Sequence, residues 1–117
     1  MTTLYGIPNC DTVKKARAFL TEQGHAHSFH DFKKAGVPVE RLPAWVAAVG
    51  WEKLLNRQGT TWRKLAPEVQ ARVVDAASAM ALMQEQPSVI KRPVVEWPSA
   101  QVSVGFTPAD WAARLAG

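Results

Sequence analysis

The chain has 117 residues, a length typical of one compact domain. Its composition, 47% hydrophobic and 21% charged, lacks the depletion of apolar residues that marks disordered chains. No apolar run reaches the roughly 18 residues of a membrane-spanning helix, and residues 1–6 lack the basic and apolar layout of a secretion signal. We therefore expect one folded domain over residues 1–117 that neither spans a membrane nor is exported, with a cytoplasmic location.

The net charge of +4 comes from 14 Lys and Arg residues against 10 Asp and Glu residues. The basic residues are scattered along the chain and form no dense patch, which is typical of a solvated surface and counts against nucleic-acid binding. A small anionic substrate is the better candidate partner.

The first third of the chain predicts a strand, a helix and a second strand. Thr2–Tyr5 is a short β-prone run that ends at the turn residues Gly6–Asn9. Apolar side chains recur at helical spacing over residues 13–20, and Gly24 is a natural helix stop. The run His25–Phe32 alternates imperfectly and predicts the second strand. Together they form a β-α-β unit with parallel strands.

Between about residues 38 and 86 the signals are helical. The predicted elements are a helix over 39–49, a short helix over 51–55, a polar loop over 56–61, and a helix over 67–86 that breaks near 75–78. This block is expected to be a helical insertion within the single domain.

The last third returns to strands. Runs over 94–97 and 101–104 flank the turn residues Pro98–Ala100, the pattern of a β-hairpin, and residues 110–115 predict a closing helix. The order is β-α-β, a helical block, then β-β-α, which indicates the α/β class.

Cys10 is the one cysteine of the sequence and follows a strand and a tight turn, at the start of the first predicted helix. Unpaired amides and the helix dipole at that position favour a thiolate over a thiol, with help from Lys14 and Lys15. A thiolate is the nucleophile of disulfide exchange and of attack on oxyanions. The alternative is a buried structural cysteine, but the strand-turn-Cys-helix context favours a functional one.

The residue three positions after Cys10 is Val13, so the Cys-x-x-Cys pair of a dithiol reductase is missing. Any mixed disulfide at Cys10 must therefore be resolved by an external thiol. Glutathione is the natural candidate.

Arg92 and Pro93 precede the third predicted strand. A proline fits at that edge of a strand, and in a thioredoxin-like layout it is a cis-proline beside the active cysteine. Arg92 would then direct its guanidinium into the same pocket, where it can bind a carboxylate or an oxyanion in bidentate fashion.

Three histidines lie close together in the sequence, which raises the question of a metal site. Spacing along a strand puts His25 and His27 on one face and His30 on the other, and no further ligand is evident. No metal site is expected.

Three segments together resemble the arsenate reductase (ArsC)/Spx family, in its YffB-like branch. They are Tyr5–Ala16, Asn56–Leu65 and Ile90–Val94. The resemblance spans almost the whole chain. It implies a thioredoxin-like sheet with a helical insertion, a reactive cysteine at Cys10 and a substrate arginine at Arg92.

Glutathione-dependent arsenate reductases of this family hold the oxyanion with three arginines. Arg92 matches the one before the cis-proline, Arg57 or its neighbour Asn56 falls near the one in the insertion, and residues 105–107 lack the third. The missing arginine counts against arsenate as the substrate. The predicted site consists of the nucleophile Cys10 and the substrate-binding residues Asn9, Asp11, Thr12, Lys14, Arg57, Arg92 and Pro93.

Two functions follow from these residues. The first is a monothiol reductase with no bound cofactor, which uses glutathione as co-substrate, acts on a small oxidised or anionic molecule, and has glutaredoxin as a further candidate partner. The second is an Spx-like adaptor that binds RNA polymerase or another protein. The activated context of Cys10 favours the enzyme.

Overall fold

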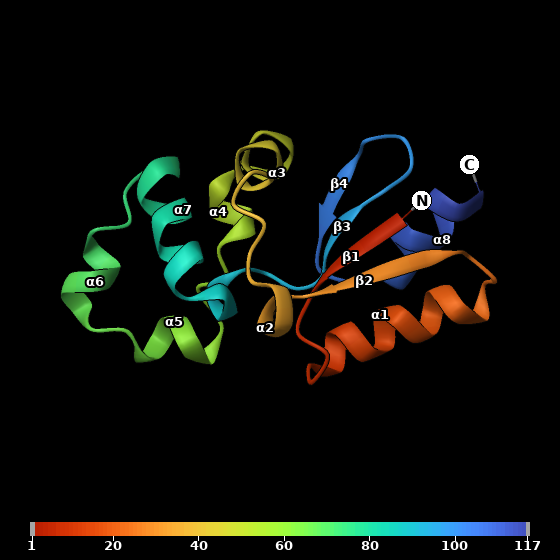
Figure 1. Ribbon diagram of the computed structural model, residues 1–117, viewed down its shortest axis with the longest axis horizontal. Coiled ribbons are helices and arrows are strands. Elements are labelled where there is room, and N and C mark those ends of the chain that lie inside the picture. Colours follow the sequence, from red (N-terminus) through yellow and green to blue (C-terminus); the bar gives the residue numbers. More distant parts are fainter. Residues whose placement is uncertain (1, 117) are drawn as a thin grey trace. The chain divides into compact units, whose positions relative to one another are not determined.

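The computed structural model describes residues 2–116, which divide into two compact units. The first unit contains the chain up to Lys34 and again from Arg92 onward, and the second contains Ala35–Lys91 (Figure 1). The helical block predicted over about residues 38–86 falls within the second unit. No helix within residues 2–116 has both the length and the apolar character needed to cross a membrane.

The first unit is built on a four-stranded sheet in the order β2-β1-β3-β4 (Figure 1). The strands are β1 (Thr2–Gly6), β2 (His27–Asp31), β3 (Val94–Glu96) and β4 (Val102–Val104). The strands β1 and β2 run parallel, whereas β1 with β3 and β3 with β4 are antiparallel. The predicted β-α-β unit, the hairpin and the α/β class are therefore confirmed.

Two helices of this unit, α1 (Asp11–Glu22) and α8 (Pro108–Ala116), pack on one face of the sheet. The helix α1 buries Val13, Ala16 and Leu20, which recur at helical spacing. Ala16 and Leu20 belong to one core cluster with strand residues that include Leu4 and Val95. This burial anchors the start of α1 against the sheet.

Glycine ends α1 as its sequence predicts, but the next strand is shorter than expected. Gly24 has a φ of 64°, a left-handed conformation that favours glycine, and the amide of His25 donates to the carbonyl of Leu20 at 2.9 Å. The strand β2 ends at Asp31, and Phe32 begins the short helix α2 (Phe32–Ala35). The prediction of a strand through Phe32 was wrong because this buried side chain belongs to a helical turn.

The second unit is helical throughout, apart from one isolated bridge between Leu55 and Ile90. Its elements are α3 (Leu42–Val49), α4 (Trp51–Leu54), α5 (Thr60–Lys64), α6 (Pro67–Ala71), α7 (Ala76–Glu85) and the 3-10 turn η1 (Pro87–Val89). Both α3 and α4 contact α7, and α5 contacts η1.

Two details of the second unit differ from the sequence prediction. The polar loop expected over 56–61 ends earlier, because Thr60 and Thr61 already belong to α5. The expected break near 75–78 lies slightly earlier, between Ala71 and Ala76. Asp75 is the N-cap of α7, and its carboxylate accepts a hydrogen bond from the amide of Ser78 at 2.9 Å.

Candidate active site

Cys10 is the N-cap residue of α1, the position that the sequence predicted. Its backbone is extended, with φ −135° and ψ 124°, and its carbonyl accepts the amide of Lys14 at 2.9 Å. The side chain is half-buried and makes no capping hydrogen bond. Cys10 therefore lies at the end of α1 where the first-turn amides have no partner within the helix.

The end of β1 contacts two parts of the predicted site through Gly6. A Cβ atom at Gly6 would lie 3.1 Å from Cγ2 of Val13 and 3.8 Å from Cβ and Cγ of Arg92. The first turn of α1 and the aliphatic part of the Arg92 side chain thus both lie close to Gly6, the last residue of β1 before the loop that leads to Cys10. Sequence reasoning missed this role of Gly6, although a glycine at the end of a strand is a known sign of close backbone approach.

The segment before β3 has the geometry that the resemblance implied. The peptide bond between Arg92 and Pro93 is cis, and the buried Pro93 accepts a hydrogen bond at its carbonyl from the amide of Gly105 at 2.9 Å. Arg92 is half-buried, and its guanidinium has no hydrogen-bond or ion-pair partner within residues 2–116. A partly buried, unpaired guanidinium is well suited to bind an anion.

The remaining predicted residues of the first unit surround Cys10 in sequence. Asn9, Asp11, Thr12 and Lys14 are all exposed, and the last three belong to the first turns of α1. Lys14 adds positive charge near the helix start, whereas Asp11 adds negative charge. These four residues can therefore contact a molecule bound at Cys10, and their roles stay predictions.

Arg57 lies in the second unit, in the loop between α4 and α5. Asn56 shapes that loop. Its backbone N–H donates to the carbonyl of Val89 at 2.7 Å, and its side-chain Oδ1 accepts a hydrogen bond from the backbone N–H of Gln58 at 3.2 Å. Arg57 is exposed, with its guanidinium carbon 5.3 Å from the ring centroid of Trp51. The side chain of Asn56 thus stabilises the loop, whereas the exposed Arg57 supplies its positive charge.

Residues 105–107, where the resemblance implies the family's third arginine, contain the aromatic Phe106 and no arginine. Gly105 follows β4 with a φ of 79°, and Phe106 packs against Phe19 and Trp111, with ring centroids 5.6 and 4.7 Å apart. This stretch therefore contributes to the core and supplies no cation.

His25 and His27 have structural hydrogen bonds. Nε2 of His25 lies 2.7 Å from Oγ1 of the buried Thr2, and Nδ1 of His27 lies 2.8 Å from the carbonyl of His25. Within residues 2–116 no three His, Cys, Asp or Glu residues are grouped as metal ligands.

Known proteins of similar fold and sequence share this architecture. The solved structure of the YFFB (PA3664) protein is 49% identical, with a TM-score of 0.91 and 97% of each chain covered. The solution structure of an arsenate reductase (ArsC) related protein from Brucella melitensis is 51% identical, with a TM-score of 0.75, covering 97% of this chain and 93% of that one. The fold is thus the thioredoxin-like α/β fold that the sequence predicted.

A regulator is also among the relatives. The global transcriptional regulator Spx of Streptococcus agalactiae is 28% identical over 117 residues, which is 98% of this chain and 83% of the regulator. The model of the ArsC family matches residues 5–114, a stretch that includes Cys10, Arg57 and Arg92. The chain therefore belongs to the ArsC family.

Proposed function

We propose that this protein is a cytoplasmic monothiol reductase, related to arsenate reductases, that uses glutathione as its electron donor. One observation carries the proposal. The lone thiol of the sequence lies at the N-terminus of α1, and Gly6 brings the stem of the unpaired Arg92 against the strand that leads to it. The membership in the ArsC family supports the same chemistry.

The first step is attack of the Cys10 thiolate on the glutathione sulfur of a mixed disulfide. The Cys10–glutathione disulfide bond forms, the substrate's sulfur–sulfur bond breaks, and the substrate leaves as a thiolate that takes a proton from solvent. The unpaired amides at the start of α1 stabilise the attacking thiolate and orient it.

The second step regenerates Cys10. The thiolate of a second glutathione attacks the glutathione sulfur held on Cys10, so that oxidised glutathione leaves and the Cys10 thiolate is restored. Over both steps the mixed disulfide and one reduced glutathione are converted into the free substrate thiol and oxidised glutathione, so that one disulfide bond is consumed and one is formed. Since Val13 replaces a second cysteine, an internal resolving step is not available.

Arg92 binds a carboxylate of the glutathionyl group in this scheme. Its planar guanidinium can donate two parallel hydrogen bonds to a carboxylate, a geometry that lysine lacks. The family resemblance implies Arg57 as a further substrate-binding arginine. Arsenate is disfavoured as the substrate because Phe106 occupies the segment from which a third arginine would come.

Turnover of a small mixed disulfide tests the proposal. The probe is the disulfide of glutathione and 2-mercaptoethanol, with reduced glutathione as donor and oxidised glutathione measured by coupled reduction. Wild type should accelerate the reaction at catalytic concentration, and Cys10→Ser should return it to the uncatalysed rate. Equal rates for wild type and Cys10→Ser would contradict the proposal. Addition of a glutaredoxin tests that protein as a further partner.

A second function is an adaptor that binds RNA polymerase, and the similarity to Spx favours it. An adaptor that binds through its surface does not need a free thiol. Stoichiometric binding of purified RNA polymerase by both wild type and Cys10→Ser, together with absent turnover, would favour the adaptor over the reductase.

A further inference from the structure

A hollow lies in the first unit, at the end of the sheet opposite Cys10. Its volume is about 400 Å³, and the side chains that line it include His25, Trp97, Ser99, Gln101, Arg114 and Leu115. The strand β1 is five residues long and leads from this end toward the Cys10 loop, so the two sites are separated by roughly 15 Å of strand. A hollow of this size is in the range of small-molecule sites, about 300 to 1,000 Å³.

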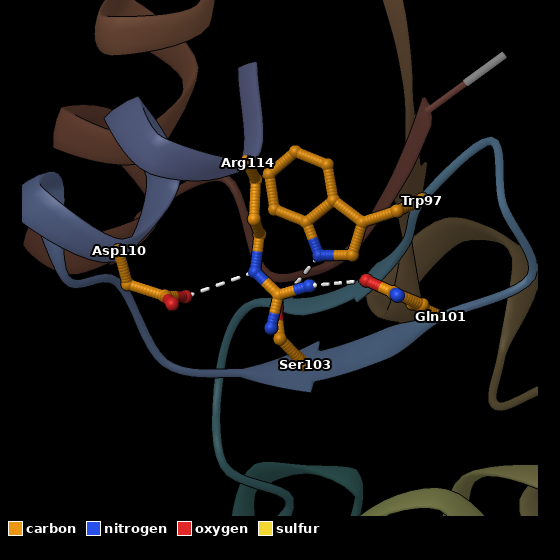
Figure 2. Close-up of polar contacts among 5 residues, drawn as sticks. All are labelled: Trp97, Gln101, Ser103, Asp110 and Arg114. Atoms are coloured by element: carbon orange, nitrogen blue, oxygen red, sulfur yellow. Dashed lines mark hydrogen bonds and ion pairs between the residues drawn. The ribbon is translucent and has the colours of Figure 1, made fainter. Parts of the chain in front are cut away.

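The guanidinium of Arg114 is fixed in place by three contacts (Figure 2). Its Nε donates to the carboxylate of Asp110 at 2.9 Å, its Nη1 donates to Oε1 of Gln101 at 2.9 Å, and its central carbon lies 5.4 Å from the ring centroid of Trp97. The indole is itself held, because its Nε1 donates to Oγ of Ser103 at 2.9 Å. The cation is therefore preorganised against an aromatic wall, which lowers the entropic cost of binding a ligand.

Several donors of this pocket have no protein partner within residues 2–116. A guanidinium has five N–H groups, and the bonds to Asp110 and Gln101 use two of them. Within residues 2–116 the side-chain amide nitrogen of Gln101 has no hydrogen-bond partner, and His25 uses its Nε2 toward Thr2 while its Nδ1 has no partner. Among residues 2–116, the side chains that line the pocket include no carboxylate.

We propose that this pocket binds a small organic anion, with its carboxylate against Arg114 and Gln101 and a flat apolar body against Trp97 and Leu115. The Asp110 carboxylate contacts Arg114 at Nε, which leaves both terminal nitrogens of the guanidinium with unused N–H groups. The excess of donors selects a negative group, and the aromatic and aliphatic walls select an apolar body. This site is independent of the proposed reductase activity.

Titration of the ¹⁵N-labelled full chain with benzoate tests the proposal. The indole N–H signal of Trp97, identified by its loss in Trp97→Phe, reports on the pocket. Benzoate should shift it saturably, and neutral benzamide should bind at least about 10-fold more weakly, a ratio worth about 1.4 kcal/mol. Inorganic phosphate alone should also bind more weakly, because it lacks the apolar body. An unmoved signal, or equal affinities for all three probes, would overturn the proposal.

A charge reversal within the pocket provides the second test. Gln101→Glu keeps the shape of the side chain and its contact with Arg114, but it adds a carboxylate where the ligand's own carboxylate would lie. Benzoate should then bind at least about 10-fold more weakly, while alkylation of Cys10 is unchanged. The matched control Gln84→Glu, at an exposed position on α7, should leave benzoate affinity unaltered. Wild-type affinity in Gln101→Glu would overturn the proposal.

Discussion

At the residue scale, Val13 decides which kind of thiol chemistry is open to Cys10. It stands where a dithiol reductase has its second cysteine, and it is fully buried with Cγ2 directed at Gly6. The Val13 side chain therefore packs the start of α1 against the end of β1, and it has no redox chemistry. This is the physical reason to expect an external thiol in the second step.

Replacement of Arg92 by lysine separates a binding arginine from a structural one. Lysine keeps the charge but loses the bidentate geometry, so the affinity for glutathione should fall by about 1 to 3 kcal/mol. Isothermal titration measures the affinity and thermal unfolding measures the stability. The exposed Arg72, on the second unit, offers the control Arg72→Lys, which should alter neither. Lost stability with unchanged affinity would remove Arg92 from the site.

Gly6→Ala tests the close approach at the end of β1. The new Cβ would lie 3.1 Å from Cγ2 of Val13, so the first turn of α1 must shift by a few tenths of an ångström. Overpacking of this kind costs about 1 to 3 kcal/mol in stability, and the shift should also slow alkylation of Cys10 by iodoacetamide.

A control for Gly6→Ala needs a position without this close approach. Gly36, where a Cβ would meet no atom within 4 Å, is a poor control because its φ is 73°. The better control is Ala18→Gly on the exposed side of α1, which should lower stability and leave alkylation unchanged. Unchanged alkylation in a folded Gly6→Ala would contradict the role assigned to Gly6.

At the element scale, the sequence predicted the elements whose signals are local. The apolar spacing of Val13, Ala16 and Leu20 and the stop at Gly24 were sufficient for α1. The second unit was harder because its helices are short, and a helix such as α5 (Thr60–Lys64) is too brief for periodicity to distinguish it from a polar loop. Whether such a short segment forms a helix or a loop depends on its packing against the rest of the fold.

The turn of the β3-β4 hairpin contains a residue in a strained conformation. Ala100 has a φ of 64°, which costs an L-residue with a Cβ about 1 to 2 kcal/mol, and its amide donates to the carbonyl of Trp97 at 3.0 Å. Ala100→Gly should therefore raise the free energy of unfolding by about 0.5 to 1 kcal/mol, after the entropic cost of glycine is subtracted. Denaturant unfolding measures it. The mid-helical control Ala18→Gly should change stability in the opposite direction, and destabilisation by both would contradict the assignment.

The N-cap of α7 makes stability depend on pH. Hydrogen bonds from the backbone and side chain of Ser78 hold the pKa of Asp75 below its ordinary value of 3.8. Since the pKa is lower in the folded state, the stabilisation is fully present above the unfolded pKa and is lost as the pH falls through the folded one. The difference in unfolding free energy between wild type and Asp75→Ala should thus be full at neutral pH and shrink in acid. Asp75→Asn, which keeps an acceptor but cannot ionise, should show less of this pH dependence. A difference that is constant with pH would contradict the role of the Asp75 charge.

At the scale of the whole molecule, the candidate site depends on residues from distant parts of the sequence. Cys10 and Arg92 were predictable because a helix start and an Arg-Pro pair are local signals, and the family resemblance linked them. The contact of both regions with Gly6 was not predictable, since it requires the pairing of β1 with β3. The pocket around Arg114 was missed for the same reason, because α8 and the hairpin turn meet only in the folded chain.

The central claim is that Cys10 exchanges disulfides with glutathione as a single thiol. Intact-mass spectrometry after exposure to oxidised glutathione tests it most directly, with the rate of modification measured against that of a small free thiol under the same conditions. We predict one glutathionyl group per chain, located on Cys10, formed faster than on the free thiol and removed by reduced glutathione. An unmodified chain, or modification no faster than that of the free thiol, would contradict the account.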